Sequence, residues 1–449
     1  MCLIPTAPKA REKERMPNCI VACVTLAPAM LLPQYRSVEL MKPTPKRFRA
    51  RLLWSVALAI GSSLSMVAAT FSDANWMSMG GIPGADAQVR AACVDDLGSL
   101  YIGGDFTVVG GVLANRVAKW DGTNWSALGS GMDNTVFALA MSGNQIYAGG
   151  SFRTAGGKPA THIAKWNGSG WSPLGSGMNP YGYVLALAVA GTNLYAGGDF
   201  TSAGGSAANS IAKWDGSHWS ALGSGMNGGV SALALSGTNL YAGGYFTSAD
   251  GNPANYVAKW DGSSWSALAS GTASTINPYV YALAVYGGDL YAGGGFTTAG
   301  GSPASKIAKW NGNSWSALGP GLTGGFYYFG VQALTVLGSG LYAGGEFATA
   351  GGVEATHIAK WDGSSWSGLG PGLDSYVFAL AAPGRNLYAG GAFAKAGGNS
   401  LNFIAQWDGS SWSPVGSAGV CDRVLALAVS GSGVYAGGAF TCAGGNSAN

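Results

Sequence analysis

The stretch AKWDGSHWSALGSGM, residues 212–226, combines residue types that could do chemistry. Its two tryptophans could stack on a sugar ring, and Asp215 and His218 could ligate a metal ion. Nearly the same phrase occurs seven times along the chain, but the histidine occurs in this copy alone. Asp215 also has a simpler role, because an Asp-Gly pair favours a tight turn. These features favour a repeated scaffold over a repeated site.

The spacing inside the repeats supports that interpretation. The tyrosine of the YxGG motif and the second tryptophan are 24 residues apart in every complete copy, as from Tyr147 to Trp171. Loops that bind ligands tolerate changes of length, whereas packed strands do not. A buried tryptophan removes about 150–250 Å² from water, which is worth roughly 4–6 kcal/mol. We therefore expect the tryptophans to pack in a core rather than to bind sugars.

Residues suited to catalysis or metal binding are scarce. The histidines are His162, His218 and His357, too few for a copper site of the galactose-oxidase kind. The chain has no HExxH or GxSxG motif and no paired zinc-ligand spacing. We expect no catalytic residue, metal or cofactor, although Asp199 and Glu346 follow the glycine pair and could converge near a central channel.

Repeats of 46–51 residues organise residues 73–449, a period typical of four-stranded propeller blades. Each repeat can be divided into four strands, for example at 136–141, 145–152, 162–166 and 171–175. An Asn-Gly or Asp-Gly pair between the last two strands predicts a hairpin with a type I′ turn. No segment has a sustained 3.6-residue period, so helices should be nearly absent outside the leader. The paired glycines indicate a close approach to another backbone.

The motif LYAGGxFxxAGG…IAKWDG…W resembles the repeats of Kelch-type and galactose-oxidase-like propellers. It is more similar still to the repeats of the Rax2-like family of surface cell-polarity proteins. The resemblance covers about residues 73–449 and implies an all-β propeller of four-stranded antiparallel blades. It also implies a surface polarity or adhesion module, although a fold shared by many functions does not identify the ligand.

The motifs predict eight blades, with seven as the alternative. The first strand and the YxGG strand each occur eight times and the KW strand seven times. The second tryptophan occurs eight times if Trp76 in NWMSMGG is counted. The closing blade would then combine strands from both ends of the chain, with either a missing third strand or a truncated sequence.

Two cysteines flank the last hairpin. A two-residue turn at Gly431 and Ser432 would place Cys421 opposite Cys442, which predicts a disulfide in an exported protein. The alternative is a pair of free thiols. Cys93 lies in the first inner strand and should be a small core residue.

Residues 1–72 have the features of a secretory leader. A basic run from Lys42 to Arg51 precedes an apolar stretch from Leu52 to Ala69, which ends in small residues. The pattern predicts translation from Met41, cleavage near Ala69, and a secreted, periplasmic or cell-surface protein. The alternative is an uncleaved signal anchor, which would be the protein's one link to a membrane.

Charge argues against nucleic acid as a partner. Ten of the 24 Lys and Arg residues but only three of the 21 acidic residues lie in residues 1–72. The remainder of the chain is therefore mildly acidic, which does not suit a phosphate-binding surface.

Length varies between repeats only in the connectors that join the second tryptophan of one repeat to the next inner strand. In a propeller these connectors share one face, where exposed aromatic side chains favour binding. The predicted ligand-binding residues are Tyr181, Tyr183, Tyr279, Tyr281, Phe326, Tyr327, Tyr328 and Tyr376, together with Asp199 and Glu346. The alternative is that Tyr281 and Phe329 pack inward.

These observations favour an exported, monomeric, non-catalytic propeller that binds a protein or a glycan through its variable connectors. One alternative is a hydrolase or lyase that acts on polysaccharide at the central channel. The other is the surface polarity or adhesion module that the Rax2-like resemblance implies.

Overall fold

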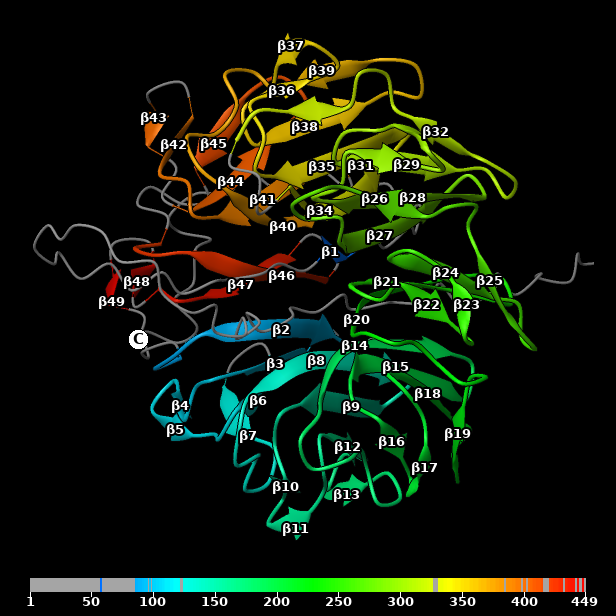
Figure 1. The fold of residues 1–449 in the computed structure, drawn as a ribbon. Coiled ribbons are helices and arrows are strands. Elements are labelled where there is room, and N and C mark those ends of the chain that lie inside the picture. The colour runs from blue at the N-terminus through cyan, green and yellow to red at the C-terminus, as the bar shows by residue number, and fades with distance from the viewer. Residues whose placement is uncertain are drawn as a thin grey trace, which may run out of the picture.

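The computed structural model describes residues 57–58 and 85–447, except positions 96, 98, 122–123, 326–329, 383–384, 397–398, 401–402, 415–419, 431–432, 441 and 444–445. The described residues form repeated antiparallel sheets, with no helix among them. This part of the chain accordingly contains no helix that could span a bilayer. Figure 1 shows the sheets arranged about a common centre, as in a β-propeller.

Each repeat forms one antiparallel sheet whose strands follow one another from the centre outward. The sheets are β2 (Val89–Val94), β3 (Leu100–Gly104), β6 (Val117–Trp120) and β7 (Trp125–Ala127); β8 (Val136–Ser142), β9 (Gln145–Gly150), β12 (Ile163–Trp166) and β13 (Trp171–Pro173); β14 (Tyr183–Ala190), β15 (Asn193–Asp199), β18 (Ile211–Trp214) and β19 (Trp219–Ala221); β20 (Val230–Ser236), β21 (Asn239–Gly244), β24 (Val257–Trp260) and β25 (Trp265–Ala267); β27 (Val280–Tyr286), β28 (Asp289–Gly294), β31 (Ile307–Trp310) and β32 (Trp315–Ala317); β34 (Val331–Leu337), β35 (Gly340–Gly345), β38 (Ile358–Trp361) and β39 (Trp366–Gly368); β40 (Val377–Ala381), β41 (Leu387–Gly391), β44 (Ile404–Trp407) and β45 (Trp412–Pro414); and the two-stranded pair β46 (Val424–Ser430) and β47 (Gly433–Gly438). We name each sheet by its innermost strand.

Short strands lie between the second and third strands of each sheet. They form hairpins of two-residue strands: β4 (Val108–Val109) with β5 (Val112–Leu113), β10 (Thr154–Ala155) with β11 (Lys158–Pro159), β16 (Ser202–Ala203) with β17 (Ser206–Ala207), β22 (Ser248–Ala249) with β23 (Asn252–Pro253), β29 (Thr298–Ala299) with β30 (Ser302–Pro303), β36 (Thr349–Ala350) with β37 (Val353–Glu354), β42 (Lys395–Ala396) with β43 (Asn399–Ser400), and β48 (Cys442–Ala443) with β49 (Asn446–Ser447). β26 (Thr272–Ala273) and β33 (Leu322–Thr323) pair with β29 and β36. β1 (Ala57–Leu58) pairs in parallel with β40.

The sheets close into a ring. Each innermost strand contacts the innermost strand of the next sheet, and β46 contacts β2; Figure 1 shows these two strands side by side. The same packing occurs at the closing joint as elsewhere. A Cβ built on Gly437 would lie 2.5 Å from Cγ1 of Val89, as one on Gly149 would lie 2.5 Å from Cγ1 of Val184.

The paired glycines are required by two different close approaches. A side chain on Gly149 would collide with Val184 of the next sheet. A side chain on Gly150 would collide with the carbonyl oxygen of Thr135 in its own sheet. The predicted backbone approach is therefore confirmed for the second glycine of the pair, whereas the first makes room for a neighbouring valine.

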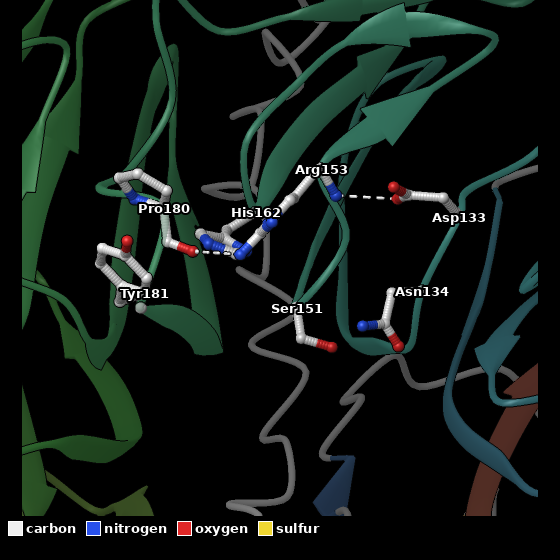
Figure 2. Close-up of a pocket in the computed structure, with 8 residues that line it drawn as sticks. Asp133, Asn134, Ser151, Arg153, His162, Pro180 and Tyr181 are labelled. Carbon is white, nitrogen blue, oxygen red and sulfur yellow. Dashed lines mark hydrogen bonds between the residues drawn. The ribbon is translucent and has the colours of Figure 1, made fainter.

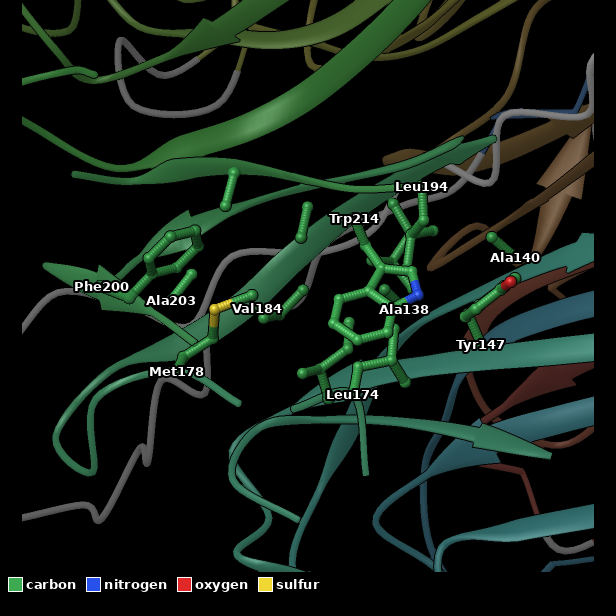
Figure 3. Packing of buried hydrophobic residues seen from close by; sticks show 14 of the residues in the cluster. Ala138, Ala140, Tyr147, Leu174, Met178, Val184, Leu194, Phe200, Ala203 and Trp214 are labelled. Atoms are coloured by element: carbon green, nitrogen blue, oxygen red, sulfur yellow. The ribbon is translucent and has the colours of Figure 1, made fainter. Parts of the chain in front are cut away.

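The tryptophans pack in the core, as their invariant spacing predicts. The two indoles of each four-stranded sheet lie with ring centroids 5.3–5.5 Å apart. Most of the fourteen indoles are buried, among them Trp120 and Trp171 at 3% exposure. Figure 3 shows Trp214 with Leu174 and Met178 of the preceding repeat, within the cluster that joins the β8 and β14 sheets.

The second tryptophan of a sheet also bonds to the sheet before it. Its Nε1–H donates to a leucine carbonyl oxygen, as from Trp171 to Leu128 at 2.7 Å and from Trp265 to Leu222 at 2.8 Å. Six sheets make this bond. In the β2 sheet, Nε1 of Trp125 is buried and has no partner. The sheets are thus linked in chain order by a buried hydrogen bond as well as by apolar contact.

The Asn-Gly and Asp-Gly hairpins form, but the type I′ prediction is wrong. Trp166 pairs with Trp171, so four residues make the turn, and φ is positive at Gly168 but not at Asn167. The Asn167 side chain accepts hydrogen bonds from the backbone N–H groups of Ser169 and Gly170 at 3.0 and 2.9 Å. The side chain, rather than a left-handed backbone at both positions, closes the turn.

The last hairpin has the predicted register only in part. Ser430 pairs with Gly433, but a bulge after Val424 shifts the register by one residue. Simple extrapolation of the register therefore does not place Cys421 opposite Cys442. The Cys442 side chain lies outside the described residues, so the disulfide stays a prediction. Cys93 is buried in the core, as expected.

Candidate binding face

One face of the ring carries the variable connectors together with the segments that join the second and third strands. We call it the rim face. The two kinds of segment are pinned together, because Oδ1 of Asp133 in a connector accepts hydrogen bonds from the N–H groups of Arg153 and Thr154. Asp86 makes the same contact with Thr107 and Val108. These acids hold the connectors in place, so they are not free for a ligand.

The first variable position on this face is a β-bulge. Every innermost strand is irregular between a valine and the alanine two residues later. Bulges re-aim side chains, and here the residue between the valine and the alanine differs widely. The bulge residues are Arg90, Phe137, Leu185, Ser231, Tyr281, Gln332, Phe378 and Leu425.

The second variable position is the residue before the third strand. It has a φ of 61–69° in all seven four-stranded sheets, although it is never glycine: it is Arg116, His162, Ser210, Tyr256, Lys306, His357 and Phe403. Such a conformation costs roughly 1–2 kcal/mol for a residue with a side chain. The backbone enforces it: the N–H of His162 donates to the Phe152 carbonyl at 2.7 Å, and its own carbonyl accepts from Gly150 at 3.0 Å.

Five tyrosines form a continuous aromatic group, which we call the tyrosine arc: Tyr183, Tyr245, Tyr256, Tyr279 and Tyr281. Tyr279 lies at its centre, with ring centroids 5.8, 5.7 and 6.4 Å from those of Tyr245, Tyr256 and Tyr281. Tyr183 and Tyr245 pack against the same cluster. Sequence reasoning predicted three members and missed Tyr245 and Tyr256, which occupy the positions of Asp199 and His162 in other repeats.

Burial and charge differ within the arc. Burial raises the pKa of Tyr183 to about 12, with a smaller contribution from the negative charge of Asp199. The hydroxyl of Tyr183 donates to Oδ2 of Asp199 at 3.3 Å. Tyr281 is 8% exposed, and its hydroxyl bonds to Asn277, so it packs inward as the alternative predicted. The other four tyrosines of the arc are half-buried, and Asp199 beside Tyr183 is exposed.

A second aromatic group lies farther round the rim face. The ring of Tyr376 is 5.5 Å from that of His357 and 6.3 Å from that of Phe378. Glu346 is 1% exposed, and Nζ of Lys306 donates to its backbone carbonyl at 2.7 Å. Burial raises the pKa of Tyr376, and the charge of Glu346 adds to this. The predicted residues Phe326, Tyr327 and Tyr328 lie outside the described residues.

The carboxylates that follow the glycine pair share this face but do not meet. Asp105 makes an ion pair with Arg90 at 2.6 Å, Asp199 is exposed, and Glu346 is buried. In the described part of the chain no two of them bond to each other, and no group of His, Cys, Asp and Glu could hold a metal ion. Glycoside hydrolysis requires a facing pair of carboxylates, and the described residues do not supply one from these positions.

A polar pocket of about 420 Å³ opens on the rim face between the β8 and β14 sheets. Figure 2 shows His162 and Arg153 between Pro180 and Tyr181 on one side and Asp133 on the other. The ring of Tyr181, a predicted binding residue, is 91% exposed at this pocket. The arrangement combines an aromatic surface with several hydrogen-bonding groups.

The fold and the repeated rim positions define a β-propeller repeat protein. No protein-family model matches the chain, and no curated protein matches it. The chain is similar to the computationally designed Ika8 protein, with a TM-score of 0.53 and 17% identity over 80% of this chain and 95% of that one. At this identity the likeness shows the fold alone.

Two other solved structures are more distant. The extracellular domain of the putative one-component system BT4673 from B. thetaiotaomicron has a TM-score of 0.44 and 12% identity, over 73% of this chain and 39% of that one. A chain of the mitotic checkpoint complex has a TM-score of 0.43 and 17% identity, over 73% of this chain and 96% of that one.

Proposed function

We propose that this protein is an exported, non-catalytic β-propeller that binds a protein or a glycan through its rim face. The observation that carries the proposal is the contrast between scaffold and rim. At each bulge the flanking valine and alanine are the same in all repeats, while the residue between them ranges from Arg90 to Leu425. All of these bulge residues except Arg90 are buried, so the bulges vary the support beneath the rim face, while the exposed Tyr181 and Asp199 lie on its surface.

The left-handed position strengthens this argument. The chain uses glycine at most positions with positive φ, where it costs least. Before the third strand it instead keeps a costly side chain of changing chemistry, from Lys306 to Phe403. Strained residues that persist are often functional. Arg116 and Tyr256 at these positions belong to the residue types that contribute most to binding energy at interfaces.

The aromatic content of the rim favours a protein or glycan ligand. Tyrosines supply large amphipathic surfaces at a low cost in conformational entropy. The arc and the Tyr376 group together extend over several sheets, which suits an extended ligand. The alternative of a polysaccharide hydrolase is less well supported, because Asp199 and Glu346 differ in burial and do not form a pair.

The test is binding of residues 73–449 to glycan arrays and to candidate extracellular proteins. Tyr181→Ala and Asp199→Ala change exposed rim residues and should weaken binding at least tenfold in combination. His218→Ala changes an exposed residue in a turn between β18 and β19, at the other end of its sheet, and should have no effect. Release of sugar products, abolished by Asp199→Ala, would favour the hydrolase instead.

We further propose an eight-bladed ring whose last blade is completed by the segment around Trp76. Two observations support this closure. Asp86 caps Thr107 and Val108 as Asp133 caps the next sheet, so residues 85–88 enter β2 as a connector does. Nε1 of Trp125 is buried without the carbonyl partner that the equivalent indoles have, and Met79 stands three residues after Trp76 as Leu128 stands after Trp125.

The closure can be tested by comparing two chain lengths. With residues 73–449, Trp125→Phe loses indole packing and one buried hydrogen bond, the second of which is worth about 1 kcal/mol. With residues 85–449, the same substitution loses the packing alone and should lower the free energy of unfolding by about 1 kcal/mol less. Equal effects in both chains would argue against a strand from the Trp76 segment.

The compartment and family relationship are part of the same proposal. Residues 1–72 act as a secretory leader, the mature protein is a monomer with a Cys421–Cys442 disulfide, and its relatives are Kelch-type and Rax2-like propellers. Export of the full chain, sequencing of the mature N-terminus and the mass of the protein before and after reduction test these points. A retained leader would instead favour a membrane-anchored surface module.

A further inference from the structure

We infer that the pocket between the β8 and β14 sheets binds a neutral hexopyranose unit. We call it the His162 pocket and define it by Asn134, Ser151, Arg153, His162, Pro180 and Tyr181. The inference rests on the proposed function, because the pocket opens on the rim face, and it names the class of ligand. The argument depends on one histidine, one exposed ring and the balance of charge.

The side chain of His162 is buried in the pocket wall and makes no hydrogen bond. It is 2% exposed, and neither ring nitrogen makes a hydrogen bond within ordinary limits of distance and angle, although the backbone carbonyls of Pro180 and Asn179 lie near enough to influence its pKa. More than nine in ten buried polar groups in proteins have a partner, so two unpartnered nitrogens that line a pocket indicate a ligand that supplies them. Figure 2 shows the ring beside Arg153 and near Pro180.

The left-handed backbone does not by itself leave the ring nitrogens of His162 without hydrogen bonds. His357 occupies the same left-handed position, with a φ of 63° against 66° for His162. Nδ1 of His357 nevertheless lies 3.1 Å from the Gly345 carbonyl oxygen, and its ring packs edge-on against Tyr376. The position can therefore satisfy the side chain of a histidine.

The protonation state of His162 suits a hydroxyl-bearing ligand. Burial lowers its pKa, although the carbonyl oxygens of Pro180 and Asn179 oppose this. A neutral imidazole has one donor and one acceptor nitrogen. A sugar hydroxyl can both donate and accept, so two neighbouring hydroxyls could satisfy both nitrogens.

Tyr181 supplies the surface on which a sugar ring can lie. Its side chain is 91% exposed, an unusual state for so large an apolar surface. A pyranose has an apolar face of C–H groups and an edge of hydroxyls. The pocket matches both, because Tyr181 lies at its margin while Ser151, Asn134 and His162 provide polar atoms. Its volume of about 420 Å³ suits a small ligand.

The charges favour a neutral ligand. Arg153 contributes a positive charge, and its guanidinium already donates to the Pro180 carbonyl at 3.2 Å. Asp133 contributes a balancing negative charge, and its Oδ1 is used by two backbone N–H groups. A phosphate or sulfate would find little net positive charge here, whereas a neutral ligand needs none.

The experiment is calorimetry and NMR with residues 73–449. The probes are methyl glycosides of glucose, galactose and mannose, oligosaccharides that end in these sugars, and glucuronate. At least one neutral probe should bind, and Tyr181→Ala and Ser151→Ala should each weaken it at least fivefold. His218→Ala, which changes an exposed histidine at the other end of its sheet, should leave binding unchanged. Ring nitrogen shifts of His162 should move on saturation, a readout that needs no variant.

The outcomes separate the inference from the proposed function. Binding of simple glycosides identifies a monosaccharide ligand, and binding of oligosaccharides alone identifies a glycan terminus; both support the inference. Tighter binding of glucuronate than of every neutral probe would overturn the charge argument. If glycans or proteins bind the rim and Tyr181→Ala and Ser151→Ala have no effect, the pocket inference fails while the proposed function stands. If nothing binds the rim, both fail.

Discussion

Substitution of one packing glycine tests the account of how the sheets hold together. In Gly243→Ala the new Cβ would lie 2.6 Å from Cγ1 of Val280 and 3.3 Å from Cδ1 of Leu283, both in the next sheet. Carbon atoms prefer separations of about 3.5–4.0 Å, so the β20 and β27 sheets must move apart by about 1 Å at this contact. Overpacking of this kind costs about 1–3 kcal/mol.

A double-mutant cycle isolates the contact. Val280→Ala alone removes two buried methyl groups and should cost about 2 kcal/mol from burial and cavity terms. It also removes the atom that collides, so the combined variant should be at least 1 kcal/mol more stable than the sum of the single effects predicts. Gly170→Ala is the matched control, because a Cβ there meets nothing within 4 Å.

Urea unfolding of residues 73–449 measures these effects, with tryptophan fluorescence and circular dichroism compared to verify a single transition. The reasoning is refuted if Gly243→Ala is as mild as Gly170→Ala. It is also refuted if the effects of Gly243→Ala and Val280→Ala are additive, because the cost would then not come from their contact.

Two further predictions concern buried polar groups. Trp265→Phe removes the indole donor from the Leu222 carbonyl, which keeps only the N–H of Gly225 at 3.2 Å. It should cost about 0.5–1.5 kcal/mol more than Trp214→Phe, whose Nε1 is buried without a partner; equal costs in urea unfolding would contradict the role of the indole bond. Burial raises the pKa of Tyr388 to about 12, and its hydroxyl donates to Gln406 at 3.0 Å. Because the unfolded chain loses this proton near pH 10, the stabilisation is complete below pH 10 and is lost as pH rises to about 12. Tyr388→Phe should reduce that loss in alkaline unfolding experiments, and an unchanged pH profile would argue against it.

The fold could be predicted because the packed residues recur at fixed spacing along the sequence. The fixed distance from Tyr147 to Trp171 follows from strands that must stay in register, and the size of the indoles makes their burial favourable. The turn type could not be predicted from the Asn-Gly pair alone, because the Asn167 side chain closes the turn through its own hydrogen bonds. The shift in register was also hidden, because a bulge inserts a residue into an apolar run without breaking it.

The candidate site could be predicted only where it uses long connectors. Tyr181, Tyr183 and Tyr279 lie in connectors whose variable length and aromatic content predicted a binding role. Tyr245 and Tyr256 were missed because each is a single residue that differs from the other copies of a repeated motif. Tyr256 reaches the rim face through its left-handed backbone, and Tyr245 follows the glycine pair; neither placement is visible in the local sequence. Alignment of the repeats position by position would have marked both.

The indole bond between successive sheets has a consequence for synthesis. The second tryptophan of each four-stranded sheet after the β2 sheet bonds to a carbonyl of the sheet before it, and chains emerge from the ribosome with the earlier segment first. Each of these sheets thus meets a hydrogen-bond acceptor that has already been synthesised, so the ring can grow by one sheet at a time. The contact between β46 and β2 can form only after both strands have been synthesised. Its formation is therefore the step at which misfolding, and assistance by a chaperone, would have the largest effect.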